Sequence, residues 1–172
     1  LIAAGVSIAA LIVLVILSRR HEKLPRDGHI WLQFFIQSFL NATGAWTILA
    51  WGQQYIDTGL ASVLNSLSPV FVLFITLAFT RHEHITVLKL AGAALGISGV
   101  ILIVGVEALN GFGQQVAGQL AALLAAFLYG CAAVNGRRFS HLPATVTTAG
   151  VMVSASICLV PLSLLVDEPW TL

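Results

Sequence analysis

Charged side chains are scarce in this sequence of 172 residues: lysine, arginine, aspartate and glutamate make up 9% of it, against 58% hydrophobic residues. Soluble globular domains carry roughly 25% charged residues, which help to cover an apolar core. A chain with so little charge cannot build such a shell, and its mean hydropathy is +0.96. The composition excludes an ordinary soluble domain and predicts a protein that lies in the lipid bilayer.

Cysteine and methionine are also rare. Cys131 and Cys158 both fall in apolar runs, which indicates packing thiols rather than a disulfide framework. The only methionine is Met152, and the chain begins inside an apolar run, so we expect a fragment of a longer protein. The run from Leu1 to Leu17 is not a typical signal peptide, because its basic residues follow it and no small-residue cleavage pattern ends it.

Signatures of catalysis are absent as well. The sequence His82-Glu83-His84 places two histidines two residues apart, so a helix would not direct both at one metal ion. There is no GxSxG motif, no glycine-rich phosphate loop and no aspartate-rich pair inside an apolar run. We therefore expect no catalytic residue, no metal site, no cofactor and no nucleic-acid partner, and an enzyme is the weakest of the functional hypotheses.

Six apolar runs lie between the charged residues, and each is long enough for a helix of about 20 residues that crosses the bilayer, although the first is short. Lys89 interrupts the fourth run about one turn from its start, where its side chain can reach the headgroups. The runs lack the alternation of a transmembrane barrel. We predict an all-α, polytopic transmembrane bundle of six spans, at 1–18, 28–56, 58–80, 85–105, 108–136 and 139–166.

The basic residues all lie on one side of the predicted bundle. All eight follow the first, third or fifth run, whereas the other side carries Asp57, Glu107, Asp167 and Glu168 and no cation. Cytoplasmic loops of membrane proteins carry an excess of lysine and arginine. The pattern predicts a multi-pass protein of the cell (inner) membrane with loops 18–29, 81–84 and 137–142 in the cytoplasm.

Polar side chains recur on one face of the second and third runs and appear again in the fifth. Such groups usually face the bundle interior or a wet cavity. For any single residue, a hydrogen bond between helices, worth ~0.6 kcal/mol on average, explains the pattern equally well. Taken together, the polar residues favour a substrate path. No charged residue lies in the middle of any run, so we expect either a facilitator, which needs no coupling ion, or a coupling residue in helices outside this chain. The expected lining residues are Gln37, Asn41, Ser62, Asn65, Ser66, Tyr129 and Asn135.

Proline and glycine mark two further positions. Pro69 lies inside the third run, where it removes a backbone donor and can kink the helix. A broken helix near the site is a feature of transporters, but membrane helices also tolerate proline, and both interpretations stay open. Gly92, Gly96 and Gly99 lie in the fourth run, and the GxxxG spacing of the first two permits close helix approach. Packing within the molecule is the expected use, and a homodimer is the alternative.

Residues 55–71, YIDTGLASVLNSLSPVF, resemble the fourth helix of EamA-type members of the drug/metabolite transporter superfamily, with Pro69 and Glu83 at the family's proline and structural glutamate. Residues 90–105 are similar to the glycine-rich fifth helix, and residues 118–130 to the start of the second repeat. The resemblance implies ten helices in two inverted five-helix repeats. This chain would supply helices two to seven, with 1–106 from the first repeat and 107–172 from the second.

The resemblance also implies alternating-access transport of small metabolites, often export, through a cavity to which the second, third and fifth runs contribute. The leading hypothesis is therefore a transporter in the plasma membrane. The alternative is a non-transporting scaffold or assembly subunit, suggested by the Gly92/Gly96 face and the lack of buried charge. A polar cavity among the three runs would favour transport, whereas dry packing with an exposed glycine face would favour the scaffold.

Overall fold

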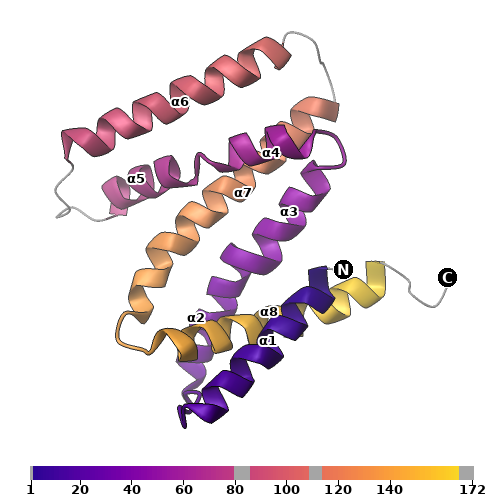
Figure 1. The fold of residues 1–172 in the computed structure, drawn as a ribbon, viewed down its shortest axis with the longest axis vertical. Helices are drawn as coiled ribbons and strands as arrows, with labels where there is room; N and C mark the ends of the chain where they lie inside the picture. The colour runs from indigo at the N-terminus through magenta and orange to yellow at the C-terminus, as the bar shows by residue number, and fades with distance from the viewer. Residues whose placement is uncertain (1, 80–85, 109–113, 167–172) are drawn as a thin grey trace. The chain divides into compact units, whose positions relative to one another are not determined.

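The computed structural model describes residues 2–79, 86–108 and 114–166, which form helices and, within these ranges, no strand (Figure 1). A π-helical segment, Phe39–Thr43, joins α2 to α3, and a 3-10 turn, Arg137–Phe139, follows α7. The predicted all-α class is confirmed. The α-helices are α1 (Ile2–Arg19), α2 (Gly28–Ser38), α3 (Gly44–Gly52), α4 (Thr58–Asn65), α5 (Ser68–Phe79), α6 (Val87–Ala108), α7 (Gln114–Gly136) and α8 (Ala144–Val166).

Among the described residues, three helical segments are long and apolar enough to cross a membrane: Thr58–Ala78, Gln115–Phe139 and Ala144–Leu164. Two shorter apolar helices, Ala3–Arg19 and Val87–Leu102, correspond to the first and fourth predicted runs. The second run forms α2, the π-helical segment and α3 in unbroken succession. Helices satisfy every backbone polar group within one segment, which the bilayer requires, so the apolar runs fold as a helical transmembrane bundle.

The chain divides into two compact units. The terminal unit comprises residues 1–43 and 136–172, and the central unit comprises residues 44–135. In the terminal unit both α1 and α2 pack against α8, and in the central unit both α4 and α5 pack against α6. This division differs from the repeat boundary predicted near residue 106, which stays a prediction.

Phe34 of α2 occupies the core of the terminal unit. Its side chain has no exposed surface, stacks on Phe139 with ring centroids 5.3 Å apart, and meets the edge of Trp31 at 5.8 Å. A Cβ atom at Gly150 of α8 would overlap the Phe34 ring, so only glycine leaves room for it. In a second cluster, Leu17 of α1 packs with Val146 and Ala149 of α8.

The C-terminus of α1 is a Schellman motif built on a histidine. The Glu22 N–H donates to the Leu17 carbonyl and the His21 N–H donates to the Ser18 carbonyl, both at 3.2 Å. His21 has a φ of 56°, in the left-handed region where glycine is the usual residue. The motif turns the chain so that the Glu22 carboxylate accepts a hydrogen bond from the Thr145 hydroxyl at the start of α8. A carboxylate there is favoured by the helix dipole.

In the central unit, close helix approach depends on glycines that the sequence analysis did not single out. A Cβ at Gly118 of α7 would lie 2.8 Å from the Gly52 carbonyl oxygen of α3. A Cβ at Gly130 of α7 would lie 2.8 Å from the Phe71 Cβ of α5. Small residues allow backbones to approach in this way inside membranes. The two glycines therefore determine where α7 contacts α3 and α5.

The predicted packing glycines of α6 have fewer neighbours. A Cβ at Gly96 would lie 3.7 Å from Val70 of α5, an ordinary contact. Apart from the chain neighbours and the backbone of the same helix, no described atom lies within 4 Å of a Cβ built at Gly92 or Gly99. Helix packing at Gly92 and Gly99 therefore stays a prediction, and it would need another helix to contact α6 at these positions.

Candidate functional site

The third predicted span is a broken helix. α4 ends at Asn65, α5 begins at Ser68, and Pro69 follows at the second position of α5. Proline has no N–H, so Pro69 cannot donate to the Asn65 carbonyl four residues earlier. The Ser68 hydroxyl donates to that carbonyl instead, at 2.6 Å, and the Ser66 hydroxyl donates to the Val63 carbonyl at 2.6 Å. The serines thus supply hydrogen bonds at the break.

The side chain of Asn65 lies at this break. Its Oδ1 atom is buried and accepts no hydrogen bond within the described part of the chain. A buried acceptor without a donor costs about 1–3 kcal/mol. Asn65 would regain this energy if a donor from a solute or a water reached it. The combination of a broken membrane helix and an unsatisfied amide oxygen makes Asn65 the strongest candidate for a binding position.

A second polar position in the central unit joins α3 to α7. The side chains of Trp46 and Tyr129 are hydrogen-bonded, and because indole can only donate, the Tyr129 hydroxyl is the acceptor. Tyr129 is one of the residues that the sequence predicts to line a path. Sequence spacing could not have paired them, since they lie on different helices and carry no local signal of their contact.

The other predicted lining residues of the central unit are bonded in different ways. The Ser62 hydroxyl donates to the Thr58 carbonyl of its own helix at 2.8 Å. Ser62 and Ser66 are both exposed, and each directs its proton to its own backbone. Asn135, near the end of α7, is half-buried and interacts with another group. These residues retain acceptor capacity, and their place on a path stays a prediction.

Gln37 and Asn41 belong to the terminal unit. The Gln37 Nε2 atom would lie 3.6 Å from a Cβ at Gly136, so the amide lies against the end of α7. Asn41 is half-buried in the π-helical segment Phe39–Thr43. π-Helical turns are rare and occur frequently at functional sites. The extra residue in such a turn has no compositional signal, which explains why the sequence did not predict it.

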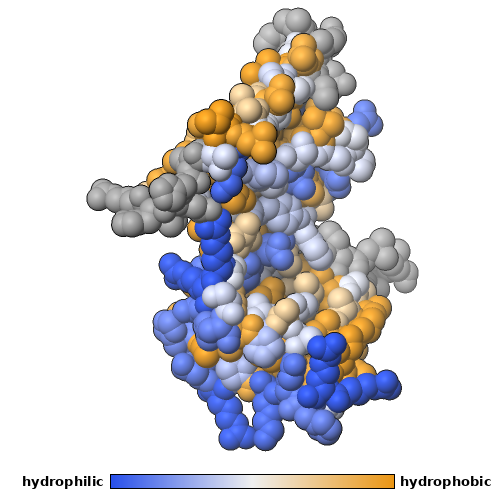
Figure 2. Space-filling model, turned by 60° about the vertical axis from the view of Figure 1, so that its left-hand side comes forward, coloured by the Kyte–Doolittle hydropathy of each residue, from blue (hydrophilic) through white to orange (hydrophobic). Residues whose placement is uncertain are grey.

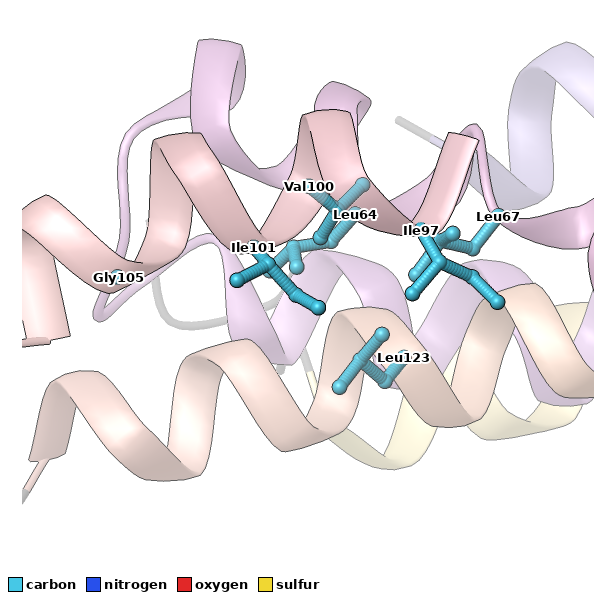
Figure 3. Close-up of a pocket in the computed structure, with 7 residues that line it drawn as sticks. All are labelled: Leu64, Leu67, Ile97, Val100, Ile101, Gly105 and Leu123. Carbon is cyan, nitrogen blue, oxygen red and sulfur yellow. The ribbon is translucent and has the colours of Figure 1, made fainter. Parts of the chain in front are cut away.

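A cavity of about 310 Å³ in the central unit is apolar (Figure 3). Leu64, near the end of α4, and Leu67, within the helix break, point into it towards α6 and α7, whereas Asn65 is not among its lining residues. Such a cavity offers no side-chain hydrogen bond to a polar solute, so it is not the polar path that the sequence predicts. It is lined by Leu64, Leu67, Ile97, Val100, Ile101, Gly105 and Leu123.

Several predicted features lie outside the described residues. Residues 80–85 contain the family's structural glutamate, Glu83, the His82-Glu83-His84 sequence and the predicted cytoplasmic loop 81–84. Residues 167–172 contain Asp167 and Glu168. What the sequence predicts for these residues stays a prediction.

Comparison with known proteins supports the resemblance. The chain is 33% identical over 136 residues to the uncharacterized transporter YoaV of Bacillus subtilis, covering 78% of this chain and 46% of that protein. It is 29% identical over 100 residues to the aromatic amino acid exporter YddG of Ancylobacter novellus, covering 56% of this chain and 34% of that protein. The chain thus spans about half the length, or less, of these curated relatives.

A solved crystal structure has a similar fold. It superposes on 96% of this chain, and on 57% of its own, with a TM-score of 0.73 at 22% sequence identity. The EamA-like transporter family matches residues 1–105. Because this match covers more than half of a chain that folds as a multi-pass helical membrane bundle, the chain belongs to the EamA-like transporter family.

Proposed function

We propose that this protein transports small metabolites across the plasma membrane by alternating access, as an exporter, and that it is not an enzyme. Its family and the relatives named as transporters support this proposal, and one relative is named as an exporter of aromatic amino acids. The observation that carries it is the helix break at Asn65, whose amide oxygen is buried and unsatisfied.

The chemistry of this position suits a solute that donates hydrogen bonds. A polar solute that leaves water must replace its hydrogen bonds inside the bundle. Asn65 can accept one without breaking a bond of its own, so the exchange costs little. Asn41, in the π-helical segment of the terminal unit, is a separate position at which we propose contact with solute.

Removing these amides is expected to slow transport. Asn65→Ala and Asn41→Ala should each lower the initial rate about tenfold, since losing a hydrogen bond to solute costs roughly 1–1.5 kcal/mol. The assay uses the full-length protein in liposomes and a panel of radiolabelled small metabolites that includes aromatic amino acids. Ser98→Ala is the matched control, because the Ser98 hydroxyl is exposed and bonds only to its own helix. Wild-type rates in both asparagine variants, at equal insertion, would refute the site.

The sidedness of the loops is part of this proposal. We assign loops 18–29, 81–84 and 137–142 to the cytoplasm and the α3–α4 turn to the outside. After Cys131 and Cys158 are replaced by alanine, Ser140→Cys should react with a membrane-impermeant maleimide only in inverted vesicles. Gln54→Cys should react only in intact cells, and both positions are exposed. Labelling of Ser140→Cys in intact cells would show that the orientation is the opposite of the one assigned here.

A scaffold or assembly subunit, with self-association as a homodimer, is the second candidate. Two observations favour it: the cavity of the central unit is apolar, and Gly92 of α6 is exposed with open space at its Cβ position. A full-length protein that inserts normally, forms dimers and moves no member of the metabolite panel would favour this candidate over transport.

A further inference from the structure

One end of the terminal unit carries a dense group of cations, which we call the basic surface. The start of α8, which follows the α7–α8 connection, is held against the end of α1 and the loop after it by the Glu22–Thr145 hydrogen bond and by the packing of Leu17 on Val146. Figure 2 shows hydrophilic residues, in blue, gathered in the lower part of that view. The basic surface consists of six exposed residues: Arg19, Arg20, Lys23, Arg26, Arg137 and Arg138.

The carboxylates of the same loops are already engaged. Glu22 accepts from the Thr145 hydroxyl, and Asp27 caps α2 by accepting from the His29 N–H at 3.0 Å. Arg137 has an interaction of its own. Within the described residues, the other five cations of the basic surface form no ion pair. The two carboxylates keep their charge when they accept these hydrogen bonds, but the six cations outnumber them, so the surface has a net positive charge that is available to an external anion.

The loop that carries most of these cations has a defined conformation. The Schellman motif at His21 fixes its start, and the Trp31 indole N–H donates to the Pro25 carbonyl at 2.9 Å near its end. Ordering long side chains and loops on binding costs conformational entropy. Because the backbone is already held, an anion bound here would have to order only the side chains.

Exposed apolar side chains lie on α1 and α2, the two helices that flank the loop carrying most of these cations. Val15 and Ile16, which precede Arg19 by about one turn of α1, are 54% and 40% exposed, and Leu32 of α2 is 58% exposed. A soluble anion would contact the cations and leave these side chains unused. An amphiphile with an anionic head and an apolar tail would contact both, so the arrangement favours a lipid.

We propose that the basic surface binds the headgroups of anionic phospholipids, with their acyl chains against Ile16 and Leu32. Arginine suits this role because its planar guanidinium forms paired hydrogen bonds with phosphate oxygens. Basic segments next to a membrane helix attract anionic lipids. This inference does not depend on transport, and it holds for a scaffold as well.

The test uses the full-length protein in vesicles with equal amounts of phosphatidylcholine and phosphatidylglycerol. After mild extraction with detergent, the retained lipids are quantified by mass spectrometry. The wild-type protein should retain phosphatidylglycerol several-fold over phosphatidylcholine. The combined variant Arg19→Gln, Arg20→Gln, Lys23→Gln and Arg26→Gln should retain the two lipids about equally, because it removes four of the six cations that attract the anionic headgroups. The combined variant Arg19→Lys, Arg20→Lys and Arg26→Lys is the matched control and should keep the preference.

Salt and phosphate provide a second measurement that needs no variant. Raising the salt concentration to about 0.5 M should weaken the wild-type preference, because screening shortens the range of the attraction. Inorganic phosphate at about 20 mM should leave it intact. The proposal would be overturned if the wild type retained both lipids equally, or if inorganic phosphate displaced the phosphatidylglycerol. It would also be overturned if the glutamine variant kept the wild-type preference, or if the lysine variant lost it completely.

Discussion

Phe34→Ala is expected to lower the free energy of unfolding by about 3–5 kcal/mol, the largest effect of any substitution considered for this protein. The Phe34 ring has no exposed surface and contacts Phe139, Trp31 and Gly150. Its removal leaves a cavity where α2 packs against α8, and these helices cannot close it without losing their other contacts. Thermal unfolding of the full-length protein in detergent, followed by fluorescence-detected size exclusion, measures the effect.

Gly150→Ala tests the same contact from the other helix. The added methyl group would overlap the Phe34 ring, so this variant alone should be destabilised by about 1–3 kcal/mol. In the double variant Phe34→Ala, Gly150→Ala the clash is absent because the ring is gone. The two effects should therefore not add, and the double variant should be about as stable as Phe34→Ala. Additive losses would mean that Phe34 and Gly150 are not in contact.

Gly118→Ala is expected to lower the free energy of unfolding by about 1–3 kcal/mol. The new Cβ would lie 2.8 Å from the carbonyl oxygen of Gly52 and 3.0 Å from the Cβ of Tyr55. A backbone oxygen cannot rotate away as a side chain can, so α7 would have to move away from α3. The same movement should strain the hydrogen bond between Trp46 and Tyr129, which also joins these helices.

Gly99→Ala is the matched control for this substitution. Gly99 is also a helical glycine, but open space surrounds its Cβ position. Alanine there should be neutral or stabilising by up to about 1 kcal/mol, because alanine favours a helix more than glycine does. Unfolding in detergent compares the two variants at equal expression. If Gly118→Ala is as stable as Gly99→Ala, α7 and α3 do not approach each other closely at Gly118.

Much of the fold could be predicted from the sequence because insertion into a membrane depends on properties that add up along the chain. A run of about 20 apolar residues determines a spanning helix whatever its neighbours are. The six runs, the all-α class and the family resemblance of residues 55–71 followed from such local features. The polar residues Asn65 and Tyr129 were also visible, because amides and hydroxyls are conspicuous within apolar runs.

Only the tertiary structure decided how these helices contact one another. Neighbouring helices and lipid are equally apolar, so helices in a bilayer associate through shape and close packing rather than through hydrophobicity. The GxxxG spacing singled out Gly92 and Gly96, whereas among the glycines of the central unit the tightest surroundings are those of Gly118 and Gly130. The Trp46–Tyr129 pair depends equally on which faces meet. Spacing along one helix identifies a face, whereas the partner of that face exists only once the chain has folded.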